Sequence, residues 1–330
     1  MKFTDNALNV LVAMTYKGIG RAWIVQNIKG NESTDRMVAL LNQTTKENRL
    51  ISTYEFDEKK RAISTKLKQL EGFVHGVVAI ADSDFPPYRG VVKNSEKPVA
   101  LFYSGDLSLL KRNNKNIAVI GLLNPDKDIE SFEQQVVSML LNYDVTIVSG
   151  LALGCDSIAH KESLRSNGKT IGILPSPITD ILPKANTELA KEIVKNNGLL
   201  ISEYYEKANS KAELSKRYIE RDRLQALFSD CVILSASYAE NNLGNDSGAR
   251  HAMNYALSYS ICRAIMYESK LSDDNPKYDL NRQLLREDSR IIVISRDNLQ
   301  EAIEKIIVSV ELAHSSKNWM QKDLFGQENV

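Results

Sequence analysis

Residues 146–160 constrain the fold of this chain most strongly, because they read T-I-V-S-G-L-A-L-G-C-D-S-I-A-H. Residues 146–149 are typical of a short buried strand, residues 150–154 of a tight loop, and a helix is expected from Asp156 onward. A helix start leaves backbone N–H groups unpaired and carries a partial positive charge, and glycines let an anion approach them. The pattern therefore predicts either an anion site or a plain strand-to-helix turn.

Short apolar runs and helical patterns alternate from residue 116 to about residue 310. Strands are expected at residues 117–120, 146–149, 170–174, 199–202, 231–234, 261–266 and 291–294. Helices are expected between them, as at residues 129–141, with a closing helix from Leu299. This alternation predicts an α/β fold with a largely parallel sheet covered on both faces. Ligands of such sheets collect at the carboxyl ends of the strands.

The first 75 residues are predicted to form a small helical domain. Apolar residues recur at helical spacing over residues 6–16, the sequence Lys-Gly-Ile-Gly follows at 17–20, and a second helix continues to Ile28. A helix, a Gly-Ile-Gly turn and a second helix outline a helix-hairpin-helix element, whose loop amides often contact phosphate. The alternative is a plain turn between two helices.

The composition gives no global attraction to nucleic acid. Lys and Arg number 42 and Asp and Glu number 42, so the formal net charge is zero and polyanion binding requires a local patch. Cys155, Cys231 and Cys262 form no CxxC pair, which argues against a disulfide framework or a metal site. No apolar run approaches the roughly 20 residues of a membrane span, and no signal-peptide pattern is present at the start. We expect a soluble, cytoplasmic protein with no membrane partner.

Several motifs together resemble one known family. The run S-G-L-A at 149–152, followed by Gly154, Asp156, Ala159 and His160, closely resembles the S-G-L-A-x-G-x-D-x-x-A-H signature of the DprA/Smf family, the DNA-processing proteins of natural transformation. Other motifs resemble the family's in the same order: L-P-K-A-N at 182–186, S-E-Y at 202–204, Y-I-E-R-D-R at 218–223 and D-S-G-A at 246–249.

The resemblance implies domain boundaries and a function. It implies an extended Rossmann-like domain at residues 113–312, reached through a connecting strand segment at 76–112 and followed by a flexible tail at 313–330. It implies a non-enzymatic protein that binds single-stranded DNA in DNA processing and recombination, without a cofactor. It also implies a homodimer that works with a RecA-type recombinase.

The candidate binding residues lie at the strand ends. A guanidinium group suits bidentate phosphate binding, and a lysine beside a proline turn supplies a point charge. Arg221 and Arg223 are two residues apart, so they cannot share one helical face, and one of them is also suited to pair with Glu203 or Asp222. The candidates for nucleic-acid or phosphate contact are Ser149, Gly150, Leu151, Gly154, Asp156, Lys184, Asn186, Arg221, Arg223, Ser247, Gly248 and Arg250.

Three residues depart from the family pattern. Leu123 stands where the family has an arginine that reaches phosphate, Ser235 where it has a glutamate, and Asp222 where it has an asparagine. One lost phosphate contact lowers the salt slope of binding by about one unit. Two alternatives therefore stay open. One is a regulator or antitoxin in phage defence that acts through a protein partner such as a cognate toxin; the other is a nucleotide-binding or nucleoside-phosphate-hydrolysing protein.

His160 and Cys155 raise the question of catalysis. His160 follows Asp156 by four residues on the same helical face, which is typical of an acid/base pair or of a structural hydrogen bond. Cys155 lies next to this face, but no third group that would orient a nucleophile is evident. We expect a structural role for both.

The end of the chain carries a short docking motif. The sequence Q-K-D-L-F at 321–325 resembles the peptide with which bacterial proteins bind the sliding clamp, with Gln321, Leu324 and Phe325 as its anchors. The alternative is that these apolar side chains pack on the protein's own surface.

Overall fold

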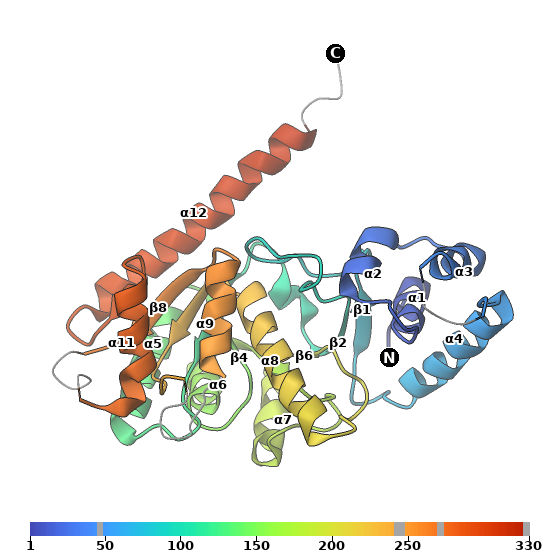
Figure 1. The fold of residues 1–330 in the computed structure, drawn as a ribbon. Coiled ribbons are helices and arrows are strands. Elements are labelled where there is room, and N and C mark those ends of the chain that lie inside the picture. The colour runs from blue at the N-terminus through green and yellow to red at the C-terminus, as the bar shows by residue number, and fades with distance from the viewer. Residues whose placement is uncertain (45–48, 241–247, 269–273, 326–330) are drawn as a thin grey trace.

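The computed structural model describes residues 1–44, 49–240, 248–268 and 274–325, with side chains described as far as Ser315. A nine-stranded sheet runs through the molecule, and helices cover both of its faces (Figure 1). The strands are β1 (Gly76–Ala79), β2 (Ala100–Gly105), β3 (Lys115–Ile120), β4 (Val145–Ser149), β5 (Lys169–Leu174), β6 (Leu199–Ser202), β7 (Cys231–Leu234), β8 (Cys262–Met266) and β9 (Ile292–Ile294). The predicted α/β fold with a largely parallel sheet is confirmed.

The strand order defines one point of the sheet at which successive strands change sides. The order is β1-β2-β6-β5-β4-β3-β7-β8-β9. Strands β3 to β9 run parallel to one another, whereas β2 pairs antiparallel with both β1 and β6, so the segment at 76–112 contributes two strands to the same sheet. The chain proceeds from β3 through β4, β5 and β6 on one side and then crosses to β7 on the other. The gap between β3 and β7 is therefore the topological switch point, where crevices form.

Helices cover the two faces in separate layers. Buried residues of α8, α9 and α11 pack on one face, and those of α5, α6, α7 and α12 on the other. Side chains set several helix starts: Asp126 caps α5 by accepting from the Ile129 N–H at 3.0 Å, and Ser210 caps α8. The bounds are α5 (Lys127–Leu141), α6 (Cys155–Arg165), α7 (Thr187–Lys195), α8 (Lys211–Leu227), α9 (Ala249–Ser258), α11 (Asp279–Glu287) and α12 (Leu299–Phe325). Three short 3-10 turns are η1 (Leu107–Leu110), η2 (Lys184–Asn186) and η3 (Pro276–Tyr278).

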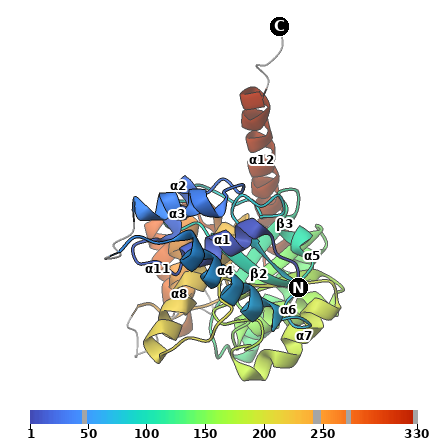
Figure 2. The same cartoon turned by 90° about the vertical axis from the view of Figure 1, so that its right-hand side faces the viewer.

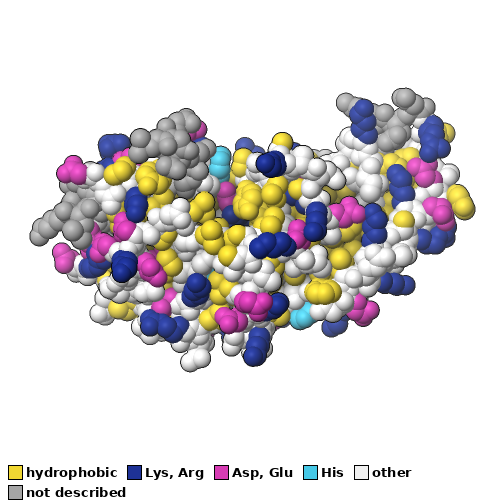
Figure 3. All heavy atoms as spheres, turned by 90° about the horizontal axis from the view of Figure 1, so that it is seen from below, with side chains coloured by type: hydrophobic (Ala, Val, Ile, Leu, Met, Phe, Trp, Pro, Cys, Tyr) yellow, Lys and Arg dark blue, Asp and Glu magenta, His cyan; other side chains and the backbone are white. Residues whose placement is uncertain are grey.

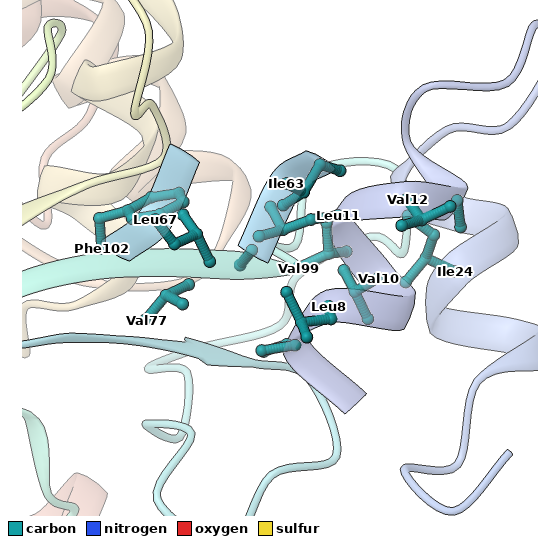
Figure 4. Packing of buried hydrophobic residues seen from close by; sticks show 14 of the residues in the cluster. Leu8, Val10, Leu11, Val12, Ile24, Ile63, Leu67, Val77, Val99 and Phe102 are labelled. Carbon is teal, nitrogen blue, oxygen red and sulfur yellow. The ribbon is translucent and has the colours of Figure 1, made fainter. Parts of the chain in front are cut away.

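Four helices form the N-terminal end of the molecule. They are α1 (Asp5–Ala13), α2 (Arg21–Asn27), α3 (Thr34–Asn42) and α4 (Thr53–Lys68). Apolar side chains of α1 and α4 point toward those of β1 and β2, including Val77 and Phe102 (Figure 4). The same buried cluster continues into α7 and β6. The N-terminal helices therefore share a hydrophobic core with one edge of the sheet.

Helix α12 extends beyond the body of the molecule (Figures 1 and 2). Its first half packs on the sheet through Ala302, Ile303 and Ile306. The segment from residue 313, predicted as a tail, is helical as far as Phe325. The side chains of Gln321, Leu324 and Phe325 lie outside the described ones, so the clamp motif stays a prediction. None of the helices in the described ranges is long and apolar enough to cross a membrane.

Candidate functional site

A pocket of about 520 Å³ opens at the carboxyl ends of β3 and β4. Residues 120–124 after β3, residues 152–153 after β4 and the first residues of α9 line it, so it lies at the switch point of the sheet. Helix α8 supplies a further wall. Its pocket residues, spaced so that they share one helical face, are Tyr218, Arg221, Asp222 and Gln225.

Asp156 holds the glycine loop that follows β4. Its Oδ2 atom accepts hydrogen bonds from the backbone N–H groups of Gly150 at 3.1 Å and Ala152 at 3.2 Å, and from Arg221 Nη1 at 3.3 Å. A carboxylate of the protein therefore occupies two amides on which we expected a phosphate. A phosphate at this loop has to bind in front of Asp156 or displace it.

Arg221 carries the one positive charge among the described residues that line the pocket. Two carboxylates face it: Asp156 at 3.3 Å and Asp222, whose Oδ1 lies 3.2 Å from Arg221 Nε. Burial raises the pKa of Asp222 to about 7, although the adjacent Arg221 acts to lower it. The pocket is consequently close to neutral when Asp222 is protonated and carries one net negative charge when Asp222 is ionised.

Two glycines of the loop are required by close contacts. A Cβ atom at Gly150 would lie 1.0 Å from Arg221 Nη1, so this glycine makes room for the guanidinium group. Gly154 has a φ of +71°, and a Cβ there would lie 2.2 Å from the carbonyl oxygen of Leu122. These contacts place the loop against α8 on one side and the end of β3 on the other.

Three further predicted residues support the loop from behind. Ser149 Oγ donates to the carbonyl oxygen of Val119 at 2.7 Å. Leu151 is fully buried with a φ of +58°. Asn186 Nδ2 donates to the carbonyl oxygens of Leu151 at 2.8 Å and Ala152 at 3.0 Å. These three residues hold the loop in its conformation and do not line the pocket.

Lys184 and Arg223 lie outside the pocket lining. The side chain of Lys184 is 68% exposed; Lys184 follows Pro183, which lines the pocket, and pairs with Asp180. Arg223 is buried and pairs with Glu203 and, at 3.5 Å, with Glu220. Of the two arginines in the motif, Arg221 alone faces the pocket.

The remaining candidates lie at the start of α9. Gly248 lines the pocket, whereas Arg250 pairs with Glu240 at 3.1 Å. Ser247 lies outside the described residues. Leu123, which the resemblance places where an arginine was expected, also lines the pocket and is 59% exposed.

His160 and Cys155 are both fully buried. His160 Nδ1 lies 2.7 Å from Thr170 Oγ1, and burial lowers the pKa of the imidazole to about 3. Burial also raises the pKa of the Cys155 thiol well above its usual value. A neutral imidazole bonded to a strand residue and a protonated thiol fit the structural roles expected from the sequence.

The pocket lining includes polar side chains that were not among the candidates from the sequence, such as Tyr218, Gln225 and Tyr238. With its amide oriented so that both of its groups are paired, Gln225 donates to Asp222 Oδ1 at 3.1 Å and accepts from the Gly150 N–H at 3.0 Å. The recurrence of polar residues at 218, 221, 222 and 225 is the signal that could have found two of them, because it marks one helical face.

The fold and this pocket define an α/β protein with a crevice at the switch point of a largely parallel sheet. The family model for DNA recombination-mediator protein A matches residues 76–302, which is more than half of the chain. The chain therefore belongs to the DNA recombination-mediator protein A family, also called DprA/Smf.

Curated relatives are similar over part of their length. Protein Smf of Escherichia coli (strain K12) is 32% identical over 145 residues, which cover 44% of this chain and 38% of that protein. DNA processing protein DprA of Streptococcus pneumoniae is 38% identical over 109 residues, covering 33% of this chain and 37% of that protein. The matched segments thus span less than two thirds of either relative.

Two solved structures share the fold. The X-ray structure of DNA processing protein A (DprA) from Streptococcus pneumoniae matches with a TM-score of 0.67 and 22% identity, covering 91% of this chain and 99% of that one. DNA processing protein A from Helicobacter pylori, studied for its single-stranded DNA binding mode, matches with a TM-score of 0.52 and 24% identity, covering 68% and 97%.

Proposed function

We propose that this protein binds single-stranded DNA at the switch-point pocket and acts, without catalysis, in DNA processing and recombination. The observation that carries the proposal is the position of Arg221 in the pocket wall, with the exposed Lys184 directly after the wall residue Pro183. Phosphate contacts of this kind give affinity without base specificity. Membership of the recombination-mediator family and the single-stranded DNA binding of the Helicobacter pylori protein support the same ligand.

The proposal extends to partners and location. The family resemblance supports a cytoplasmic homodimer that hands DNA to a RecA-type recombinase. The motif with Gln321, Leu324 and Phe325 supports docking to a sliding clamp. Sedimentation of the purified protein, alone and with each partner, tests these assemblies separately.

A second candidate function follows from the charges of the pocket. Asp156 and Asp222 offset Arg221, and the apolar Leu123 replaces the family arginine at the pocket wall. A pocket with this balance holds phosphate less tightly than one with two unopposed arginines. This favours a regulator that acts through a protein partner, such as a cognate toxin, as the alternative.

Fluorescence anisotropy with labelled oligothymidylate and labelled duplex DNA, at several salt concentrations, tests the proposal. We expect preferential binding of the single strand. The Lys184→Gln variant is expected to bind the single strand more weakly. Its salt slope, the decrease in log affinity with log salt concentration, should be smaller by about 0.7, the value for one phosphate contact on a single strand.

Lys305→Gln is the matched control, because Lys305 is also exposed and pairs with a carboxylate four residues before it in the sequence. It should leave both the affinity and the slope unchanged. Absence of single-strand binding by the wild-type protein would reject the proposal and favour the regulator.

A further inference from the structure

A second hollow lies next to the switch-point pocket, between the end of α4 and α7. Its volume is about 500 Å³, and it is lined by Phe73 and His75, by the loop at residues 178–184 and by one side of α7. Its floor is apolar, because Ile178 and Leu200 belong to the buried core. We call this hollow the α7 groove.

Phe73 is an exposed aromatic side chain at the groove. Its exposed fraction is 65%. Its backbone is held in place, since the Phe73 N–H donates to the carbonyl oxygen of Leu70 at 3.1 Å in the turn that follows α4. An exposed ring on a fixed backbone is a surface on which a nucleobase can stack, whatever its sequence.

The charges of the α7 groove complement a polyanion. Among the described residues that line it, three are lysines, Lys184, Lys191 and Lys195, and none is Asp or Glu. Lys191 and Lys195 are one helical turn apart, about 6 Å along α7. Lys184 pairs with Asp180 and Lys191 with Glu188, but exposed ion pairs are weak enough for a phosphate to replace the carboxylate.

The balance of charge in the groove is the opposite of that in the pocket. The lining of the pocket sets two carboxylates against one arginine, whereas the lining of the groove holds three lysines, two of which pair with carboxylates outside the lining. Over the whole lower face, basic side chains lie among acidic and apolar ones (Figure 3). Anion binding on this face is therefore a matter of local sites, as the zero net charge requires.

The pocket and the groove meet at a single peptide unit. Pro183 lines the pocket and Lys184 lines the groove. The pocket and the groove are therefore both bounded by the segment that contains residues 183 and 184. A single strand of DNA that leaves the pocket can continue past Pro183 and Lys184 into the groove.

The geometry points to the α7 groove as a second subsite for the same single strand, in which a base stacks on Phe73 and neighbouring phosphates contact Lys191 and Lys195. This inference rests on the proposed function and adds to it a binding surface and a direction for the strand. It also gives the N-terminal region a part in DNA binding, because Phe73 lies in the turn between α4 and β1.

Oligothymidylates of about 4 and about 16 nucleotides separate the two subsites, because the shorter one spans a single subsite. We expect Phe73→Ala to weaken binding of the longer strand about ten-fold, in line with the loss of one stacked base, and to leave the shorter strand unaffected. Lys191→Gln should lower the salt slope for the longer strand by about 0.7.

Tyr54→Ala, which removes an exposed aromatic at the other end of α4, and Lys305→Gln, on α12, are the matched controls and should bind like wild type. Circular dichroism of each variant verifies the fold. Long-strand affinities of Phe73→Ala and Lys191→Gln equal to wild type would overturn the groove subsite while leaving the pocket in place. Failure of wild type to bind either length would overturn the proposed function itself, and the subsite with it.

Discussion

Arg221 is buried between two carboxylates, with Asp156 at 3.3 Å and Asp222 at 3.2 Å. Taking three charged groups out of water is costly, and their attraction offsets this only when all of them are present. The cost of burial is visible at Asp222, whose pKa is raised to about 7. The charge of the pocket therefore changes near neutral pH, and so does the affinity we expect for an anion.

Asp222→Asn is expected to remove this pH dependence. In the wild type, DNA affinity should fall as pH rises through about 7, since the second carboxylate of the pocket ionises there. The same group stabilises the fold below its unfolded pKa and loses that contribution as pH rises through the folded value. The variant should thus bind more tightly and be more stable by on the order of 4 kcal/mol at pH 8, with little change at pH 4.

Anisotropy at pH 6 and pH 8 measures the effect on binding, and urea unfolding at pH 4 and pH 8 measures the effect on stability. Asp297→Asn, at an exposed position outside the pocket, serves as the control. Parallel pH profiles of Asp222→Asn and wild type would show that another group titrates.

Leu123→Arg is expected to increase DNA binding. Leu123 is 59% exposed in the pocket wall, so an arginine fits there without burial of its charge, and it would add one phosphate contact. The salt slope should steepen by about 0.7 and affinity should rise at low salt. Leu123→Gln, which adds length without charge, is the control; an equal gain from both variants would contradict an electrostatic cause.

At the scale of elements, the loop between β4 and α6 depends on its second glycine. Gly154 has a φ of +71°, and a Cβ there would lie 2.2 Å from the Leu122 carbonyl oxygen. Gly154→Ala is therefore expected to cost about 2 kcal/mol of unfolding free energy, seen as a lower urea midpoint. Gly20→Ala is the control, because a Cβ there meets nothing within 4 Å; a midpoint for Gly154→Ala no lower than that of Gly20→Ala would mean that the loop relaxes freely.

The central strands were predictable because each is a short apolar run bounded by turn residues. Strands β6 and β7 have the predicted bounds, and β8 and β9 begin one residue later than predicted. The pairing of β2 with β6 was not predictable, since Phe102 and Ser202 are far apart in sequence and only tertiary contacts set their register. The contacts of Asp156 have the same origin, because its partner Arg221 comes from another helix.

At the scale of the whole molecule, the N-terminal helices and the sheet share one core and one charge network. The buried cluster runs from α1 and α4 through β1 and β2 into α7 and β6. Arg21 of α2 pairs with Glu220 of α8 at 2.7 Å and with Glu203 at 3.2 Å, and Arg223 joins the same two carboxylates. A region tied by both packing and ion pairs is expected to unfold together with the sheet.

Trp23 provides the measurement, since it lies in α2, packs against this cluster and is one of two tryptophans in the chain. In a Trp319→Phe background, its fluorescence should follow the same urea transition as far-UV circular dichroism, which reports mainly on the helices of the sheet region. A Trp23 transition at lower urea would mean that residues 1–75 open before the sheet does. Phe73, at the boundary between the two regions, would then be moved relative to α7, and the α7 groove would exist only in the fully folded state.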